Sequence, residues 1–193
     1  MFDRVFTERS DMPADDKAKE PLIGTDLVLL LLGADTSVPS ARDQIHGITR
    51  LEKLLYLADR ETKVSGNVDG SFKFKAYNYG PYSKEIYEAV DVLEEAGLLR
   101  ETRVFEGRSL DELEELDTSG EGREGVERRF ELTVRGKAVA KMLSGQHPDV
   151  LKSLSQIKNK YAGMPLQALI RYVYSVYPED ATQSIIRDEV LRG

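Results

Sequence analysis

Few side chains in this sequence have a type and spacing that could support catalysis. The two histidines, His46 and His147, lie about a hundred residues apart, and neither has a carboxylate or second histidine at metal-ligand spacing. Each is predicted to be a plain surface or capping residue. The segment 120–125, Gly-Glu-Gly-Arg-Glu-Gly, matches a dinucleotide-binding fingerprint in its letters, but a strand pattern follows it instead of the required helix. We therefore expect no enzymatic activity, metal or cofactor, although an active site made only of carboxylates stays an open alternative.

Tyrosines point to a different chemistry, that of recognition. Tyr77, Tyr79, Tyr82 and Tyr87 surround Gly80-Pro81. On a rigid turn, such rings offer a large contact area and a polar tip at little entropic cost, although at least two are expected to pack against the preceding helix instead. Basic residues at helical spacing in that helix would extend an exposed patch. The residues predicted to bind a partner protein are Arg50, Lys53, Tyr77, Tyr79, Tyr82, Lys84 and Glu88.

The helix predicted over 84–96 is acidic. It carries Lys84 against five acidic residues, which gives it a net charge of −4. In a helix-turn-helix protein this helix would enter the major groove of DNA, where phosphates would repel it. Its acidic face is either simply solvated or a surface for a protein partner, and both interpretations stay open. The whole chain has a net charge of −7, so it lacks an overall basic footprint for nucleic acid.

Positive charge lies later in the chain and supports an alternative function, that of a DNA-binding transcriptional regulator. The segment 151–171 contains four basic residues and no acidic one. An arginine on a mobile tip could also reach a phosphate or the minor groove, although the run of acids over 111–117 weakens this hypothesis. The residues predicted to contact nucleic acid in this alternative are Arg123, Arg128, Arg129, Arg135, Lys137, Lys152, Lys158 and Lys160.

The elements that would position these residues follow from the spacing of apolar side chains. Helical periodicity or strand alternation predicts, in order, a helix over 27–32, a loop over 33–47, a helix from 48 to about 61, a strand over 71–79, a helix over 84–96 and strands over 98–105 and 126–133. Gly80-Pro81 is predicted to break the first strand, and Asp26, Ser83 and Thr133 are placed to cap helices.

Further helices are predicted after the last strand. The first should bury Val134, Ala138, Val139 and Met142, and three more follow over 149–191. This order of elements is that of a winged helix. We expect a mainly α, α+β fold with a flexible arm over 1–21, a winged helix-turn-helix domain over 22–145 with a long wing loop at 106–125, and a C-terminal helical extension over 146–193. The tail is expected to pack back on the domain through its tyrosines, and it could form a homodimer.

Composition limits the environment in which the protein works. The chain has no cysteine, which excludes disulfides and thiolate metal sites. Its longest apolar run, Leu27 to Leu32, is far shorter than the roughly 20 residues that cross a bilayer. The first twenty residues carry no apolar signal-peptide core. We expect a cytoplasmic protein that does not bind membranes.

Two stretches carry a resemblance to known families. The first consists of Gly47-Ile-Thr-Arg-Leu-Glu-Lys-Leu-Leu-Tyr-Leu-Ala58, Tyr77-Asn-Tyr-Gly-Pro-Tyr-Ser83 and Glu94-Glu-Ala-Gly-Leu-Leu99. It resembles YwgA-like proteins of unknown function and, more distantly, the Panacea domain of SocA-like antitoxins. The second, Arg129-Phe-Glu-Leu-Thr-Val-Arg-Gly-Lys137, is similar to the strand-into-helix step of many winged-helix regulators. The resemblance spans about residues 24–145 and implies a non-enzymatic, antitoxin-like or adaptor module that binds a partner protein.

Overall fold

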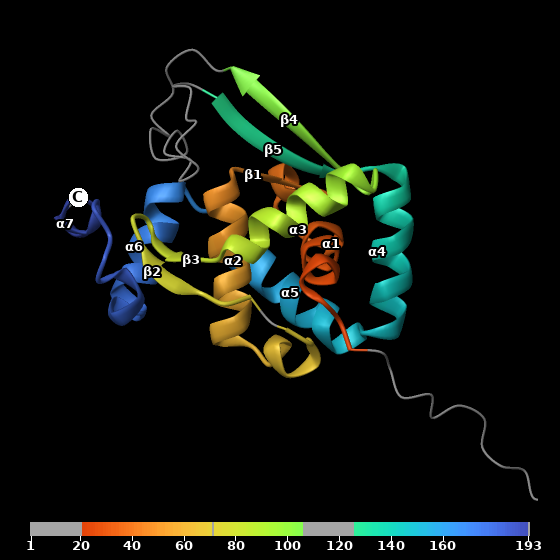
Figure 1. Ribbon diagram of the computed structural model, residues 1–193, viewed down its shortest axis with the longest axis horizontal. Coiled ribbons are helices and arrows are strands. Elements are labelled where there is room, and N and C mark those ends of the chain that lie inside the picture. The colour runs from red at the N-terminus through yellow and green to blue at the C-terminus, as the bar shows by residue number, and fades with distance from the viewer. Residues whose placement is uncertain (1–20, 71, 106–125, 193) are drawn as a thin grey trace, which may run out of the picture.

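The computed structural model describes residues 21–70, 72–105 and 126–192, and in these the chain is mainly helical with a small antiparallel sheet (Figure 1). This α+β composition was predicted, whereas the predictions for residues 1–20, the loop at 106–125 and Arg123 lie outside the described residues. The elements are α1 (Gly24–Gly33), β1 (Gln44–His46), α2 (Ile48–Glu61), β2 (Lys75–Tyr77), β3 (Gly80–Tyr82), α3 (Lys84–Glu95), β4 (Leu99–Phe105), β5 (Val126–Leu132), α4 (Val134–Gln146), α5 (Pro148–Tyr161), α6 (Leu166–Val176) and α7 (Arg187–Arg192), with short 3₁₀ turns at Pro39–Ala41, Val64–Asn67 and Pro178–Ala181.

Helix α1 is the centre of the core. Every side chain from Leu27 to Leu32 is at most 5% exposed, because α2, α3, α4 and α5 all contact this helix (Figure 1). A helix that is apolar all round requires such a position. Asp26 is not its N-cap as predicted; it lies inside the first turn, and its carboxylate accepts a hydrogen bond from the Ile23 amide at 3.0 Å.

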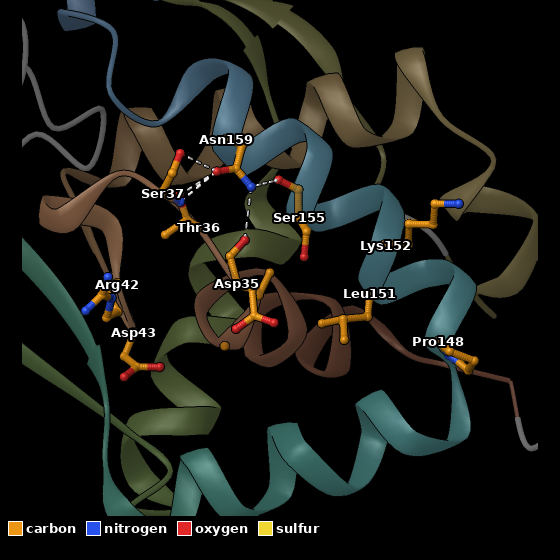
Figure 2. A pocket seen from close by; sticks show the side chains of 12 residues that line it. Asp35, Thr36, Ser37, Arg42, Asp43, Pro148, Leu151, Lys152, Ser155 and Asn159 are labelled. Atoms are coloured by element: carbon orange, nitrogen blue, oxygen red, sulfur yellow. Dashed lines mark hydrogen bonds between the residues drawn. The ribbon is translucent and has the colours of Figure 1, made fainter.

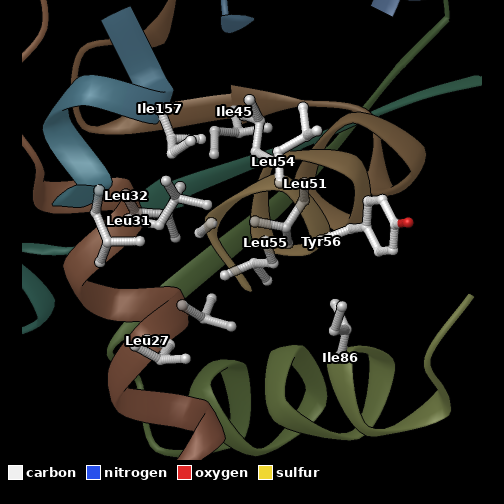
Figure 3. Close-up of a cluster of buried hydrophobic side chains, with 14 of the residues drawn as sticks. Leu27, Leu31, Leu32, Ile45, Leu51, Leu54, Leu55, Tyr56, Ile86 and Ile157 are labelled. Carbon is white, nitrogen blue, oxygen red and sulfur yellow. The ribbon is translucent and has the colours of Figure 1, made fainter. Parts of the chain in front are cut away.

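Helix α2 packs beside α1 and carries the stripe that the sequence predicts. Leu51, Leu54 and Leu55 are at most 2% exposed, and Figure 3 shows them facing Ile45 of β1 and the leucines of α1. The Tyr56 ring is fully buried and meets other aromatic rings edge-on, with ring centroids 5.2 Å from Phe74 and 5.4 Å from Tyr177. Helix α2 therefore packs against β1 and α1, which precede it in the chain, and against the rings of Phe74 and Tyr177, which follow it.

The larger sheet has the strand order β1-β5-β4, and all of its pairs are antiparallel. Strand β1 lies in the segment predicted to be a loop, and its Ile45 pairs with Phe130. A strand of three residues is too short to show a period of two in the sequence. The predicted alternation in β5 is confirmed, because Phe130 and Leu132 are buried while Arg129 and Glu131 are half-buried.

The C-terminal end of α3 has the geometry that the sequence indicates. Gly97 takes a φ of +67°, its amide donates to the Glu94 carbonyl at 2.8 Å, and the Leu98 amide donates to the Leu93 carbonyl at 2.9 Å. This pair of bonds is the Schellman motif, which favours glycine at the left-handed position. The motif turns the chain directly into β4.

Of the four residues predicted to form the inner face of α4, only Val139 is half-buried against the core, and the prediction is wrong for the other three. Val134 is 87% exposed and Met142 57%, whereas the buried residues of the helix are Gly136, Ala140 and Leu143. The reason is a close approach: a Cβ on Gly136 would lie 1.9 Å from the carbonyl oxygen of Leu98. Only glycine permits this contact, so the face that contains it turns inward.

The last three helices pack on the rest of the chain, as predicted from their tyrosines. Tyr174 is 1% exposed and Tyr172 and Tyr177 are half-buried. Helix α6 contacts α2 and β3, and the 3₁₀ turn after it contacts both strands of the hairpin. Among the described residues, no helix has the length and apolar character needed to span a membrane.

Candidate functional site

Strands β2 and β3 form a hairpin at the position where the sequence predicts a break. Lys75 pairs with Tyr82 and Tyr77 with Gly80, so the predicted long strand is a short one followed by a tight turn. Gly80 makes this turn possible, because its φ is +87° and a Cβ there would lie 2.5 Å from the Tyr174 ring. The second strand then leads directly into α3.

A buried ion pair fixes the hairpin to α2. The side chains of Glu52 and Lys53 are 4% and 0% exposed, and their charged groups lie 2.9 Å apart. Lys53 Nζ also donates to the Pro81 carbonyl at 2.7 Å, and Glu52 Oε1 accepts from the Ser83 amide at 3.0 Å. Burial raises the pKa of Glu52, while Lys53 and the amide oppose that rise. One pair thus holds both the hairpin and the start of α3.

Three half-buried tyrosine rings form a row along this hairpin and the first turn of α3. The Tyr82 ring centroid lies 5.0 Å from that of Tyr77 and 5.4 Å from that of Tyr87, and Lys75 Nζ lies 5.7 Å from the Tyr82 centroid. Burial raises the pKa of Tyr82, so the phenol is neutral and can donate or accept a hydrogen bond. The row leaves part of each ring accessible on a fixed backbone.

Charged side chains of α3 continue this surface. Lys84 and Glu88 form an exposed ion pair at 2.6 Å, one helical turn apart. Asp91, Glu94 and Glu95 are exposed beyond them, while Ile86, Ala89, Val90 and Leu93 are buried. The acidic face therefore points outward, as the sequence indicates. We call Tyr77, Tyr82, Tyr87, Lys84 and Glu88 together the tyrosine face.

The structure brings together four of the seven residues predicted to bind a partner: Tyr77, Tyr82, Lys84 and Glu88. The other three are corrected. Lys53 is fully buried in its ion pair, and Tyr79 is 8% exposed. Arg50 is half-buried and donates to the carbonyls of His46, Ala162 and Met164, so it ties α2 to the turn before α6.

The cations predicted to contact nucleic acid are mostly engaged within the chain. Arg128 pairs with Glu101 at 2.8 Å, Lys137 with Asp43 at 2.9 Å and Lys160 with Glu61 at 3.2 Å. Arg129 is half-buried, and Arg135 and Lys152 are exposed. These side chains come from β5, α4 and α5.

Lys158 is a correction, because it is fully buried rather than available to a phosphate. Its Nζ donates to the carbonyls of Leu32 and Ala34 at the C-terminal end of α1, where the helix dipole favours a cation. Burial lowers its pKa to about 8, against the opposing effect of Asp43 and Asp35. The side chain therefore caps α1 and fastens α5 to it.

A cavity of about 710 Å³ lies between the loop that follows α1 and helix α5, and of the residues predicted to contact nucleic acid only Lys152 is among those that line it. Figure 2 shows Asn159 reaching from α5 to this loop, where its Oδ1 accepts from the Ser37 amide at 2.7 Å. Its Nδ2 donates to the carbonyls of Asp35 and Ser155 at 3.2 Å and 2.8 Å. Because Asn159 is saturated by the chain itself, its visible role is to hold the loop.

The two histidines lie in different parts of the fold. The backbone of His147 joins α4 to α5: its amide donates to the Leu143 carbonyl and its carbonyl accepts from the Leu151 amide. His147 therefore occupies a cap position, which is one of the two predicted alternatives, but its side chain makes no cap hydrogen bond and is buried instead of lying on the surface. His46 lies in β1. Within the described residues, no three His, Asp or Glu side chains are grouped in a way that could hold a metal ion.

Comparison with known proteins assigns no relative to this chain: no protein-family model matches the sequence, and no curated protein matches it.

Proposed function

We propose that residues 22–145 form a winged helix-turn-helix domain and that α5, α6 and α7 are its C-terminal extension. The order α1, β1, α2, α3, β4, β5, with the β2–β3 hairpin inserted between α2 and α3, supports this assignment, as does the antiparallel sheet β1-β5-β4. In such a domain, α2 and α3 are the helix-turn-helix pair. In the sequence, residues 106–125 lie between β4 and β5, which is where a winged helix has its wing.

We propose further that this domain binds a partner protein through the tyrosine face, in an antitoxin-like or adaptor role. The observation that carries the proposal is the row of three half-exposed tyrosines, two on the hairpin and one in the first turn of α3, on a backbone that the buried Glu52–Lys53 pair holds to α2. Tyrosine is enriched among residues that dominate binding energy, and a surface fixed before binding loses little entropy on association.

The charge of α3 favours a protein over DNA as the partner. Asp91, Glu94 and Glu95 are exposed on the helix that would approach the major groove. DNA-binding affinity depends on cations that neutralise phosphates, and this helix offers carboxylates instead. A protein partner with basic groups around an apolar pocket complements both the acids and the rings.

A double exchange, Lys84→Glu with Glu88→Lys, tests the proposal without removing the intrahelical ion pair. Affinity capture from a cell extract of the source organism, with the full chain as bait, should recover a stoichiometric protein. We expect the exchange, and separately Tyr82→Ser, to weaken capture by about tenfold or more. Lys152→Glu, an exposed charge reversal on α5, is the matched control and should retain the partner. Equal capture by all four proteins, or no stoichiometric partner, would refute the proposal.

DNA binding by the wing and the basic residues has weaker support, because three of the eight cations are paired with acids and Lys158 is buried. The protein-binding proposal predicts no duplex binding at low salt. Duplex binding with a steep salt dependence, whose slope falls when Arg128 and Arg129 become alanine, would instead favour the regulator.

A further inference from the structure

Helix α4 exposes an apolar stripe that no described part of the chain covers. Val134, Ala138 and Met142 lie at positions i, i+4 and i+8 and are all exposed, Val134 by 87% and Met142 by 57%. Arg135 and Lys141 are exposed beside the stripe, and α4 contains no acidic residue. An exposed face of this composition fits a partner that is apolar at its centre and acidic around it.

The C-terminal half of α3 has that complementary composition. Val92 is 54% exposed, the largest fraction among the apolar residues of this helix, and it lies between the exposed acids Asp91 and Glu95. Glu88, the nearest member of the tyrosine face, is one turn earlier on the helix. The two halves of α3 therefore present different surfaces, one aromatic and one in which Val92 lies beside the carboxylates of Asp91 and Glu95.

The two complementary surfaces meet at one corner of the molecule. Thr133 Oγ1, at the start of α4, donates to the Gly97 carbonyl just after α3 at 2.8 Å. Figure 1 shows the end of α3 beside the start of α4. A twofold dimer requires one patch that is complementary to itself. A patch that is acidic on one side and basic on the other meets this requirement, because rotation by 180° brings each half against the opposite half.

We propose that a second copy of this chain covers this corner, with α3 of each copy against α4 of the other. Met142 and Val134 then contact Val92 of the other copy, and Lys141 and Arg135 lie opposite Glu95 and Asp91. Each contact occurs twice by symmetry, so each substitution acts twice on the dimer. Of the tyrosine face only Glu88, one turn before Val92 on the same side of α3, borders this contact, and the inference does not depend on the partner-binding proposal.

Sedimentation velocity of the full chain over a concentration series tests the dimer. The wild-type protein should show a monomer–dimer equilibrium that high salt weakens, because salt screens the charge pairs. Met142→Glu should yield monomers, whereas Met142→Leu should leave the dimer intact. Circular dichroism of each variant establishes that it is folded. A wild-type protein that stays monomeric at every concentration would overturn the proposal.

A charge exchange identifies the surface. Lys141→Glu and Glu95→Lys should each weaken dimerisation by about tenfold or more, and the double variant should restore it. Lys152→Glu, on α5, is the control and should dimerise like the wild type. A dimer that persists in Met142→Glu and ignores both charge reversals would use another surface and would also overturn the proposal.

Discussion

Lys158 should make the stability of this protein depend on pH in the alkaline range. Burial lowers the pKa of its ammonium group from 10.5 to about 8 in the folded chain. Below pH 8 the folded and unfolded chains both hold this proton, and the folded chain bears the full cost of the buried charge. Between pH 8 and 10.5 the folded chain loses the proton while the unfolded chain keeps it. The contribution of this lysine to the free energy of unfolding therefore rises with pH over that interval.

The size of the effect follows from the pKa. A lowering from 10.5 to about 8 corresponds to about 3 kcal/mol in the free energy of unfolding. Urea unfolding of the wild type and of Lys158→Met, from neutral pH to pH 10.5, measures it as the difference between the two proteins. That difference should shift in favour of the wild type as the pH rises, by up to about 3 kcal/mol.

The comparison needs a variant because other groups titrate in the same range. Burial raises the pKa of Tyr174 to about 12 and also raises that of Tyr56 and Tyr161, so both proteins lose stability as the unfolded tyrosines ionise. This loss cancels in the difference. Lys152→Met, at an exposed site, should show no such trend against the wild type. A wild-type advantage over Lys158→Met that stays constant with pH would refute the reasoning.

Three further predictions concern the Glu52–Lys53 pair, the Lys84–Glu88 pair and the close contact at Gly136. Lys53→Met should lower the free energy of unfolding by about 3–5 kcal/mol, because it leaves Glu52 buried without a counter-charge. The double variant that also carries Glu52→Gln should recover much of this lost stability. Urea titrations in which the double variant is no more stable than Lys53→Met would contradict the prediction. The exchange Lys84→Glu with Glu88→Lys should keep stability within about 0.5 kcal/mol, as thermal melts can check, since the pair is only reversed. Gly136→Ala should cost at least about 2 kcal/mol in urea unfolding, because its methyl group meets the Leu98 carbonyl; an unchanged midpoint would refute the close approach.

The sequence was sufficient for the elements that signal their own boundaries. Helix α3 has an apolar stripe, Ser83 before its first turn and Gly97 after its last one, and the structure places its ends at these residues. Helix α2 likewise begins after Gly47. In both cases the periodicity and the flanking residues are local properties, so no distant contact is needed to predict them.

Elements that depend on distant partners could not be predicted. Strand β1 exists because Ile45 pairs with Phe130, which is far along the chain. The orientation of α4 depends on the contact of Gly136 with Leu98, since apolar residues on two faces of this helix fit the periodicity equally well. The hairpin at Gly80 likewise depends on the fit of that glycine against Tyr174. Local pattern fixes an element's existence, but tertiary contact decides which face is buried.

Tertiary contacts also decide which charged side chains are available for binding, and a count of charges in the sequence does not show this. By sequence alone, Lys53 and Lys158 are indistinguishable from surface lysines, yet each is fully buried and donates to backbone carbonyls. Their amino groups hold parts of the fold together through these hydrogen bonds and are unavailable to a phosphate. The exposed charges of α3 are acidic except for Lys84, and those of α4 are all basic. Sorting of this kind creates surfaces that complement one another, so the chain's recognition chemistry is better described by its individual helices than by its net charge.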